Sequence, residues 1–157
     1  MFEREIVKLI PQLNFKKLNF ILALVFMEVA TDKEINYLLA RFEECPRIIS
    51  LYKTFGEYNL IALVYAENQR VLDSIMGSCM LRIAREVRRS IVVPIQGILI
   101  GEYIPIKIPV KKYDDPPCGI KCSECTRYNF GECVGCPVIR KYRGRLAITM
   151  SVNQFST

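Results

Sequence analysis

Apolar residues form a continuous run at residues 20–30 and then follow the spacing of a helix at residues 31–42. Residues 20–30 (FILALVFMEVA) are nearly all apolar and rich in β-favouring types, which predicts a strand covered on both faces. Thr31 and Glu34 then form a capping box, so a helix should begin there. Its apolar positions follow the spacing of one helix face: Ile35, Leu38, Leu39 and Phe42. The pair Cys45-Pro46 should end this helix, because the residue before proline avoids helical geometry.

A hairpin should follow the first helix. Residues 47–55 alternate in the manner of a strand, Gly56 and Glu57 supply a tight turn, and residues 58–66 (YNLIALVYA) return as a third strand.

Asn68 can cap a second helix, whose apolar stripe contains Val71, Leu72, Ile75, Met76, Cys79, Met80 and Ile83. The basic residues of the segment 85–89 (REVRR) would close this helix, since positive charge is favourable at a helix C-terminus.

Residues 91–93 and 95–103 predict a fourth strand, broken or bulged at Pro94 and Gly97. The order is then strand, helix, strand, strand, helix, strand. Right-handed connections fold such a chain into an α+β, ferredoxin-like βαββαβ sandwich with both helices on one face of an antiparallel sheet. The other face carries many apolar residues, so we expect it to pair with a second copy of the chain in a homodimer.

The C-terminal third changes character at Pro116-Pro117. Five of the seven cysteines follow within 19 residues, in the spacing C-x3-C-x2-C-x7-C-x2-C: Cys118, Cys122, Cys125, Cys133 and Cys136. Two C-x2-C pairs joined by a short loop can supply four thiolates to one metal ion. Disulfides are the alternative, but five is an odd number. The sequence therefore predicts a lead-in at 1–18, an α/β domain at 19–108 and a metal-binding module at 114–157.

The identity of the metal is left open between two centres. Zinc takes four ligands, and Cys122, Cys125, Cys133 and Cys136 have the familiar paired spacing, which favours zinc and leaves Cys118 spare. A [4Fe–4S] cluster also takes four thiolates, and Cys136-Pro137 is similar to the cysteine-proline ending of ferredoxin cluster motifs.

The net charge of +6 is concentrated near the C-terminus. Residues 107–157 contain 9 basic and 4 acidic residues, and the segment 138–145 (VIRKYRGR) predicts a basic loop, followed by one more strand at 146–152. A basic tail is compatible with nucleic acid as a partner, contacted through this loop or through a partner protein, and a solvated surface is the alternative explanation.

Residues 6 to about 106 resemble the ligand-binding C-terminal (RAM) domain of the Lrp/AsnC family of transcription regulators. The resemblance is carried by the lead-in 13–19 (LNFKKLN), the hairpin 54–60 (TFGEYNL) and the closing stretch 88–95 (RRSIVVPI). It implies dimers, often assembled into larger rings, and small effectors such as amino acids bound near the hairpin turn: Gly56, Glu57, Tyr58 and Asn59. Asn59 stands where the family usually has aspartate. The family's DNA-reading helices would precede Ile6, so we expect no complete helix-turn-helix here.

Catalysis is not indicated by the residue types present. There is no histidine, no phosphate-binding glycine loop and no G-x-S-x-G motif. No secretory leader and no apolar stretch long enough to span a membrane are visible, so we expect a cytoplasmic protein without membrane contact. Two functions remain: an effector-binding regulator with a structural zinc site, or an iron–sulfur redox sensor or electron carrier on the same scaffold.

Overall fold

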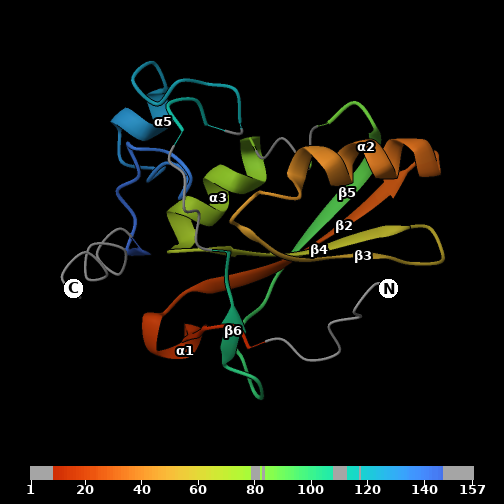
Figure 1. Ribbon diagram of the computed structural model, residues 1–157, viewed down its shortest axis with the longest axis horizontal. Coiled ribbons are helices and arrows are strands. Elements are labelled where there is room, and N and C mark those ends of the chain that lie inside the picture. Colours follow the sequence, from red (N-terminus) through yellow and green to blue (C-terminus); the bar gives the residue numbers. More distant parts are fainter. Residues whose placement is uncertain (1–8, 79–81, 83, 108–112, 117, 147–157) are drawn as a thin grey trace, which may run out of the picture.

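The computed structural model, shown in Figure 1, describes residues 9–78, 82, 84–107, 113–116 and 118–146. Its main sheet has four antiparallel strands in the order β3-β4-β2-β5. The inner strands are β2 (Ile21–Val29) and β4 (Leu60–Ala66), and the edges are β3 (Ile48–Lys53) and β5 (Val87–Pro94). The chain order βαββαβ with this strand order confirms the predicted α+β, ferredoxin-like fold.

Helices α2 (Asp32–Phe42) and α3 (Gln69–Ser78) cover one face of this sheet, above it in Figure 1. Alternate residues of the inner strands point into the core between sheet and helices: Ala23, Val25, Met27, Val29, Leu60, Ala62, Val64 and Ala66. The predicted helix starts are confirmed. The Thr31 hydroxyl accepts from the Glu34 N–H at 3.3 Å, and the Asn68 side chain accepts from the Val71 N–H at 3.0 Å. Cys79, Met80 and Ile83 of the predicted stripe lie outside the described residues.

The hairpin turn is wider than the sequence predicted, because β3 ends at Lys53 and β4 begins at Leu60. The Thr54 N–H donates to the Asn59 carbonyl at 3.0 Å, and its hydroxyl donates to the Tyr58 carbonyl at 2.6 Å. These bonds close a turn over residues 54–59, where a two-residue turn was expected.

The fourth strand begins and ends earlier than predicted. Residues 87–89 belong to β5 and do not close the preceding helix, because Arg89 pairs in register with Glu28 and contacts its carboxylate at 3.3 Å. Strand β5 ends at Pro94, although the Ile95 N–H still donates to the Leu22 carbonyl at 2.8 Å. Residues 95–102 form no strand and Tyr103 belongs to a separate strand, so the prediction of one strand over 95–103 is wrong.

A second, two-stranded sheet lies below the main one in Figure 1. It pairs β1 (Gln12–Asn14) with β6 (Tyr103–Pro105), and the short helix α1 (Phe15–Leu18) follows β1. The cysteine segment contains the short helix α5 (Thr126–Asn129).

The cysteine segment shares a hydrophobic core with both sheets: Phe15, Phe20, Leu22, Tyr65, Ile104, Ile106, Cys122, Tyr128, Val138, Ile139, Tyr142 and Leu146. Part of the sheet face that lacks helices is thus covered by the chain itself. The three-part division at 1–18, 19–108 and 114–157 stays a prediction. The predicted last strand, 146–152, lies beyond the described residues except for Leu146. Among the described helices, none has the length and apolar character needed to cross a membrane.

Candidate metal centre

All five cysteines of the predicted metal module line a single cavity of about 120 Å³. One wall belongs to the C-terminal segment and includes Pro116, Ile120, Tyr128 and Gly135 besides the cysteines. The opposite wall belongs to the α/β domain and contains Phe42, Cys45, Arg47, Ile48, Val64 and Ile75. The structure therefore brings together side chains that lie up to 18 residues apart in the motif, and adds a sixth cysteine, Cys45, that the motif does not contain.

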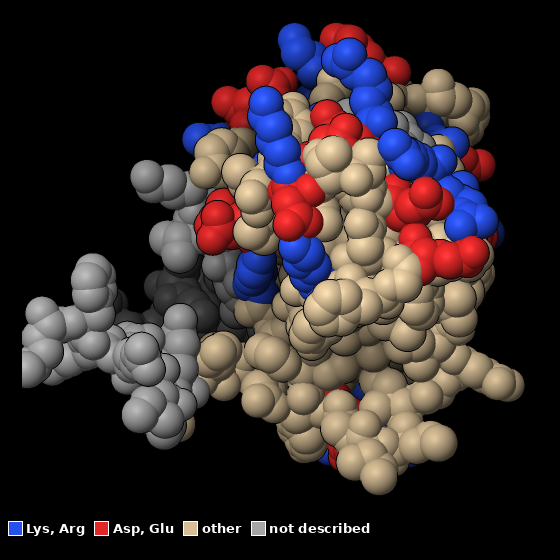
Figure 2. Space-filling model, turned by 90° about the vertical axis from the view of Figure 1, so that its right-hand side faces the viewer, with Lys and Arg blue, Asp and Glu red and all other residues tan. Residues whose placement is uncertain are grey.

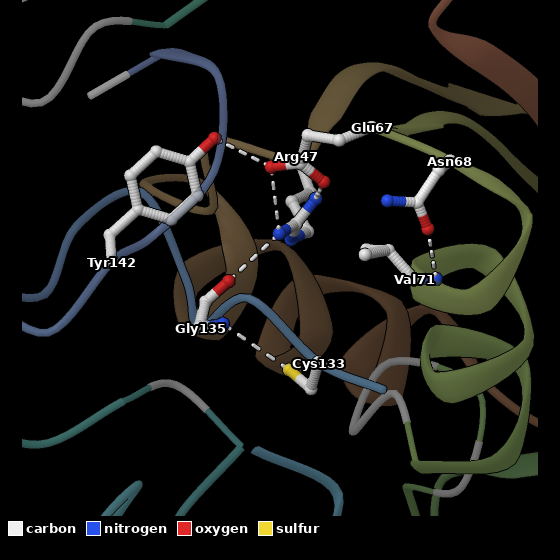
Figure 3. A network of polar contacts seen from close by, with 7 residues as sticks. All are labelled: Arg47, Glu67, Asn68, Val71, Cys133, Gly135 and Tyr142. Carbon is white, nitrogen blue, oxygen red and sulfur yellow. Dashed lines mark hydrogen bonds and ion pairs between the residues drawn. The ribbon is translucent and has the colours of Figure 1, made fainter. Parts of the chain in front are cut away.

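The turn between Cys133 and Cys136 has the geometry of a metal-binding loop. The Gly135 N–H donates to the Cys133 sulfur at 3.4 Å (Figure 3). Gly135 has a φ of +83°, and a Cβ placed there would lie 3.3 Å from the Ile139 side chain. Only glycine takes up this conformation without strain. The backbone thus directs a donor at a sulfur that would carry negative charge as a thiolate.

Two of the thiols are held in the protonated form when no metal is bound. Burial raises the pKa of Cys136 to about 12, and Cys45 adds to this while Arg47 opposes it. Burial also raises the pKa of Cys122, as do the neighbouring Cys118, Cys133 and Cys125. Crowding of this kind disfavours several thiolates together unless a cation neutralises them. A metal ion would supply that charge and displace the protons.

The thiols line the cavity wall without meeting at one point. No three metal-ligating side chains within the described ranges are close enough to hold a metal ion as they stand. The six described cysteines are all free of disulfide bonds: Cys45, Cys118, Cys122, Cys125, Cys133 and Cys136. A tetrahedral zinc site needs sulfurs about 3.8 Å apart, because each Zn–S bond is about 2.3 Å long.

A buried ion pair ties the cysteine segment to the α/β domain, as Figure 3 shows. Arg47 donates to both carboxylate oxygens of Glu67, at 2.6 and 3.1 Å, and to the Gly135 carbonyl at 2.8 Å. Tyr142 donates to the same carboxylate at 2.6 Å. Arg47, Glu67 and Tyr142 each have a partner in this cluster, so the charges can be buried at the interface between domain and cysteine segment.

The electrostatics of this network keep both Arg47 and Tyr142 protonated. Burial by itself would lower the pKa of Arg47, but the Glu67 carboxylate raises it well above the ordinary arginine value. Burial, with Glu67, raises the pKa of Tyr142 above the ordinary tyrosine value. Arg47 thus stays charged and Tyr142 stays a hydrogen-bond donor near neutral pH.

The predicted effector residues lie together at the hairpin turn, and Glu57, Tyr58 and Asn59 already make contacts within the chain. The Asn59 side chain accepts from the Val29 N–H at 2.8 Å and donates to the Val29 carbonyl at 2.7 Å. Arg89 lies 3.6 Å from the Glu57 carboxylate and 5.2 Å from the Tyr58 ring centre. Gly56 has a φ of +113° and faces open space. Effector binding by Gly56, Glu57, Tyr58 and Asn59 stays a prediction.

The basic loop packs back onto the protein through several of its arginines. Arg140 lies 3.3 Å from the Asp114 carboxylate, Arg143 stacks over the Tyr128 ring at 4.0 Å, and Arg145 donates to the Leu18 carbonyl at 2.6 Å. These contacts explain part of the positive charge as structural. Nucleic acid contact by this loop stays a prediction.

Comparison with known proteins places the fold. No protein family model and no curated protein sequence matches the chain. Among solved structures, E. coli AsnC matches at 15% identity with a TM-score of 0.54, over 61% of this chain and 64% of that one. An AsnC family transcriptional regulator from Agrobacterium tumefaciens matches at 15% identity with a TM-score of 0.51, over 60% and 62%. The structural neighbours are AsnC-family regulators. At this identity the likeness shows the fold alone, and the chain spans less than two-thirds of the length of these structures.

Sequence reasoning missed two features of the site. Cys45 was interpreted only as the end of a helix, although its Cys-Pro pair repeats that of Cys136-Pro137 and could have signalled a second thiol turn. Arg47 and Glu67 were assigned no role, and nothing in the local sequence marks them, because their pairing depends on strands that meet only in the folded sheet.

Proposed function

We propose that this chain is a non-enzymatic, regulator-type protein that assembles through its sheet and carries a metal centre in the cysteine cavity. The observation that supports assembly is the part of the sheet that neither helices nor the cysteine segment covers. Two cross-strand rows of apolar side chains lead onto it, Leu63–Leu24–Val93, whose Leu63 end packs against the second core, and Ile61–Phe26–Ile91. Ile91 and Val93 are exposed by 46% and 43%.

Figure 2 shows the surrounding surface from one side. Lysine, arginine, aspartate and glutamate side chains crowd the helical half, while the half below the sheet carries hardly any. Exposed apolar rows such as those of Ile91 and Val93 are costly in water, and a second copy of the chain presents the same rows, so a twofold homodimer would bury both. Ring assembly, amino-acid effectors at Gly56–Asn59 and action on DNA through a partner protein are part of the same proposal. They are supported by the fold shared with AsnC-type regulators.

The metal centre is supported by the gathering of five spaced cysteines around one cavity. Zinc is favoured by the paired spacing, and its role would be structural. The alternative is an iron–sulfur redox sensor or electron carrier. The gathering of the thiols around a cavity is compatible with this second function, because a [4Fe–4S] cluster fills a space larger than a single ion does.

Elemental analysis of anaerobically purified protein separates these centres. One zinc per chain in a colourless protein would establish the structural site. Brown colour, absorbance near 400 nm, iron and acid-labile sulfide would establish the cluster. A protein that folds with neither metal would contradict the proposed centre. The sample must be prepared without added metal and compared with a variant in which Cys125 and Cys133 are both replaced by serine.

Effector binding is tested separately by isothermal titration with a panel of amino acids. We expect binding heat from at least one amino acid and loss of that heat in the variant Glu57→Gln. The Glu57 side chain is 78% exposed, and glutamine has the same shape without the charge. The absence of heat from every amino acid would count strongly against an effector site at the hairpin.

A further inference from the structure

Cys45 faces the same cavity as the five cysteines of the C-terminal motif, although 73 or more residues separate it from them. It lies in the connection between α2 and β3, where its N–H donates to the Phe42 carbonyl at 2.9 Å. The α/β domain and the cysteine segment therefore each present thiols to the space between them.

The turns that hold Cys45 and Cys136 repeat one another. Their sequences are Cys45-Pro46-Arg47-Ile48 and Cys136-Pro137-Val138-Ile139. The Ile48 N–H donates to the Cys45 carbonyl at 3.2 Å, and the Ile139 N–H donates to the Cys136 carbonyl at 3.0 Å. These are β-turns with proline at the second position, where its fixed φ favours the turn. Both prolines are fully buried, so each cysteine is held at a rigid corner of the cavity wall.

Cys45 and Cys136 both line this cavity, Cys45 from the α/β domain and Cys136 from the C-terminal segment. The matched turns thus present one thiol from each part of the chain to the same space.

We propose that Cys45 is a ligand of the metal centre, so that the centre is shared between the α/β domain and the C-terminal segment. This inference rests on the proposed metal centre and adds one ligand that the C-terminal motif lacks. With Cys45 and Cys136 as two of its ligands, the bound metal joins the α2–β3 connection to the cysteine segment directly. Loading of the metal then reinforces the contact that Arg47, Glu67 and Gly135 already make beside it.

The decisive experiment compares Cys45→Ser and Cys45→Ala with wild type and with Ile75→Val. Ile75 lines the same cavity but has no sulfur, so its variant controls for repacking. Each protein is purified anaerobically, and metal per chain, the absorption and paramagnetic resonance spectra, and the rate of metal loss to a chelator are measured. For a zinc centre, Co²⁺ replaces the zinc to give a thiolate-to-metal absorption band. We expect both Cys45 variants to lose metal at least about 10-fold faster with an altered spectrum, and Ile75→Val to match wild type.

Unchanged spectra and release rates in both Cys45 variants, with metal present in wild type, would overturn the role of Cys45 and leave the metal centre standing. A wild-type protein that binds no metal would overturn the centre itself. If the variants do not fold, alkylation of wild type by iodoacetamide gives the same answer. We expect chelator treatment to speed modification of Cys45 together with that of Cys136. A Cys45 rate that does not respond to metal removal would overturn the inference.

Discussion

Among single residues, Arg47 and Glu67 form the contact on which the docking of the cysteine segment depends most directly. Their side chains are only 10% and 2% exposed, and together they engage Gly135 and Tyr142 of that segment. Removing one charge leaves the other buried without an opposite charge, which costs more than the pair contributes when intact. Replacing one member of the pair should therefore destabilise the protein more than replacing both.

We expect Arg47→Met to lower the free energy of unfolding by about 3–5 kcal/mol, because Glu67 is left as an uncompensated buried charge. The double variant Arg47→Met/Glu67→Leu should recover part of this loss. Urea unfolding of both variants measures the effect. A double variant that is less stable than Arg47→Met would contradict the expectation.

Asn59 is a second residue whose contacts predict a measurable effect. In Asn59→Asp the donor to the Val29 carbonyl is lost and a carboxylate oxygen takes its place, so we expect a loss of about 1–3 kcal/mol in unfolding free energy. The matched control is Asn129→Asp, since the Asn129 amide makes a single, longer contact of 3.3 Å at the surface. Equal losses in the two variants, by thermal or urea unfolding, would show that the Val29 bridge contributes little.

At the scale of elements, α2 depends on the capping box at its start. The Glu34 carboxylate accepts from the Thr31 N–H at 2.9 Å, and the Thr31 hydroxyl accepts in return from the Glu34 N–H. We expect Thr31→Ala to cost about 1 kcal/mol of stability, because the helix loses a partner for its first N–H groups. Lys33→Ala, an exposed change in the same turn, should cost much less. The prediction fails if urea midpoints for the two variants coincide.

At the scale of the whole molecule, the two apolar rows on the open sheet face predict the oligomeric state. We expect wild type to be a dimer or larger at micromolar concentration, and Ile91→Glu to be shifted toward monomer, because a charge buried in the interface cannot be solvated. Light scattering after size exclusion measures this. Tyr37→Glu is the control, since Tyr37 is similarly exposed but lies on α2, on the helical side.

Circular dichroism should show that both variants remain folded. A monomeric wild type, or an Ile91→Glu variant with unchanged mass, would exclude the open sheet face as the interface.

The elements that depend on neighbouring residues could be predicted from the sequence. Strand β2 and the start of α2 follow from an apolar run and a capping box, both of which act over a few residues. The spacing of the five cysteines identified the candidate site for the same reason, because short loops force nearby thiols together.

The remaining features depended on contacts between distant residues. Pairing with β2 placed Arg89 in β5 and not at the end of a helix, and pairing with β1 placed Tyr103 in a separate sheet. The ion pair of Arg47 with Glu67 and the position of Cys45 beside the C-terminal cysteines likewise arise only when the segments pack. Local sequence determines which elements form, whereas burial and strand pairing, which act through space, decided what those elements bring together.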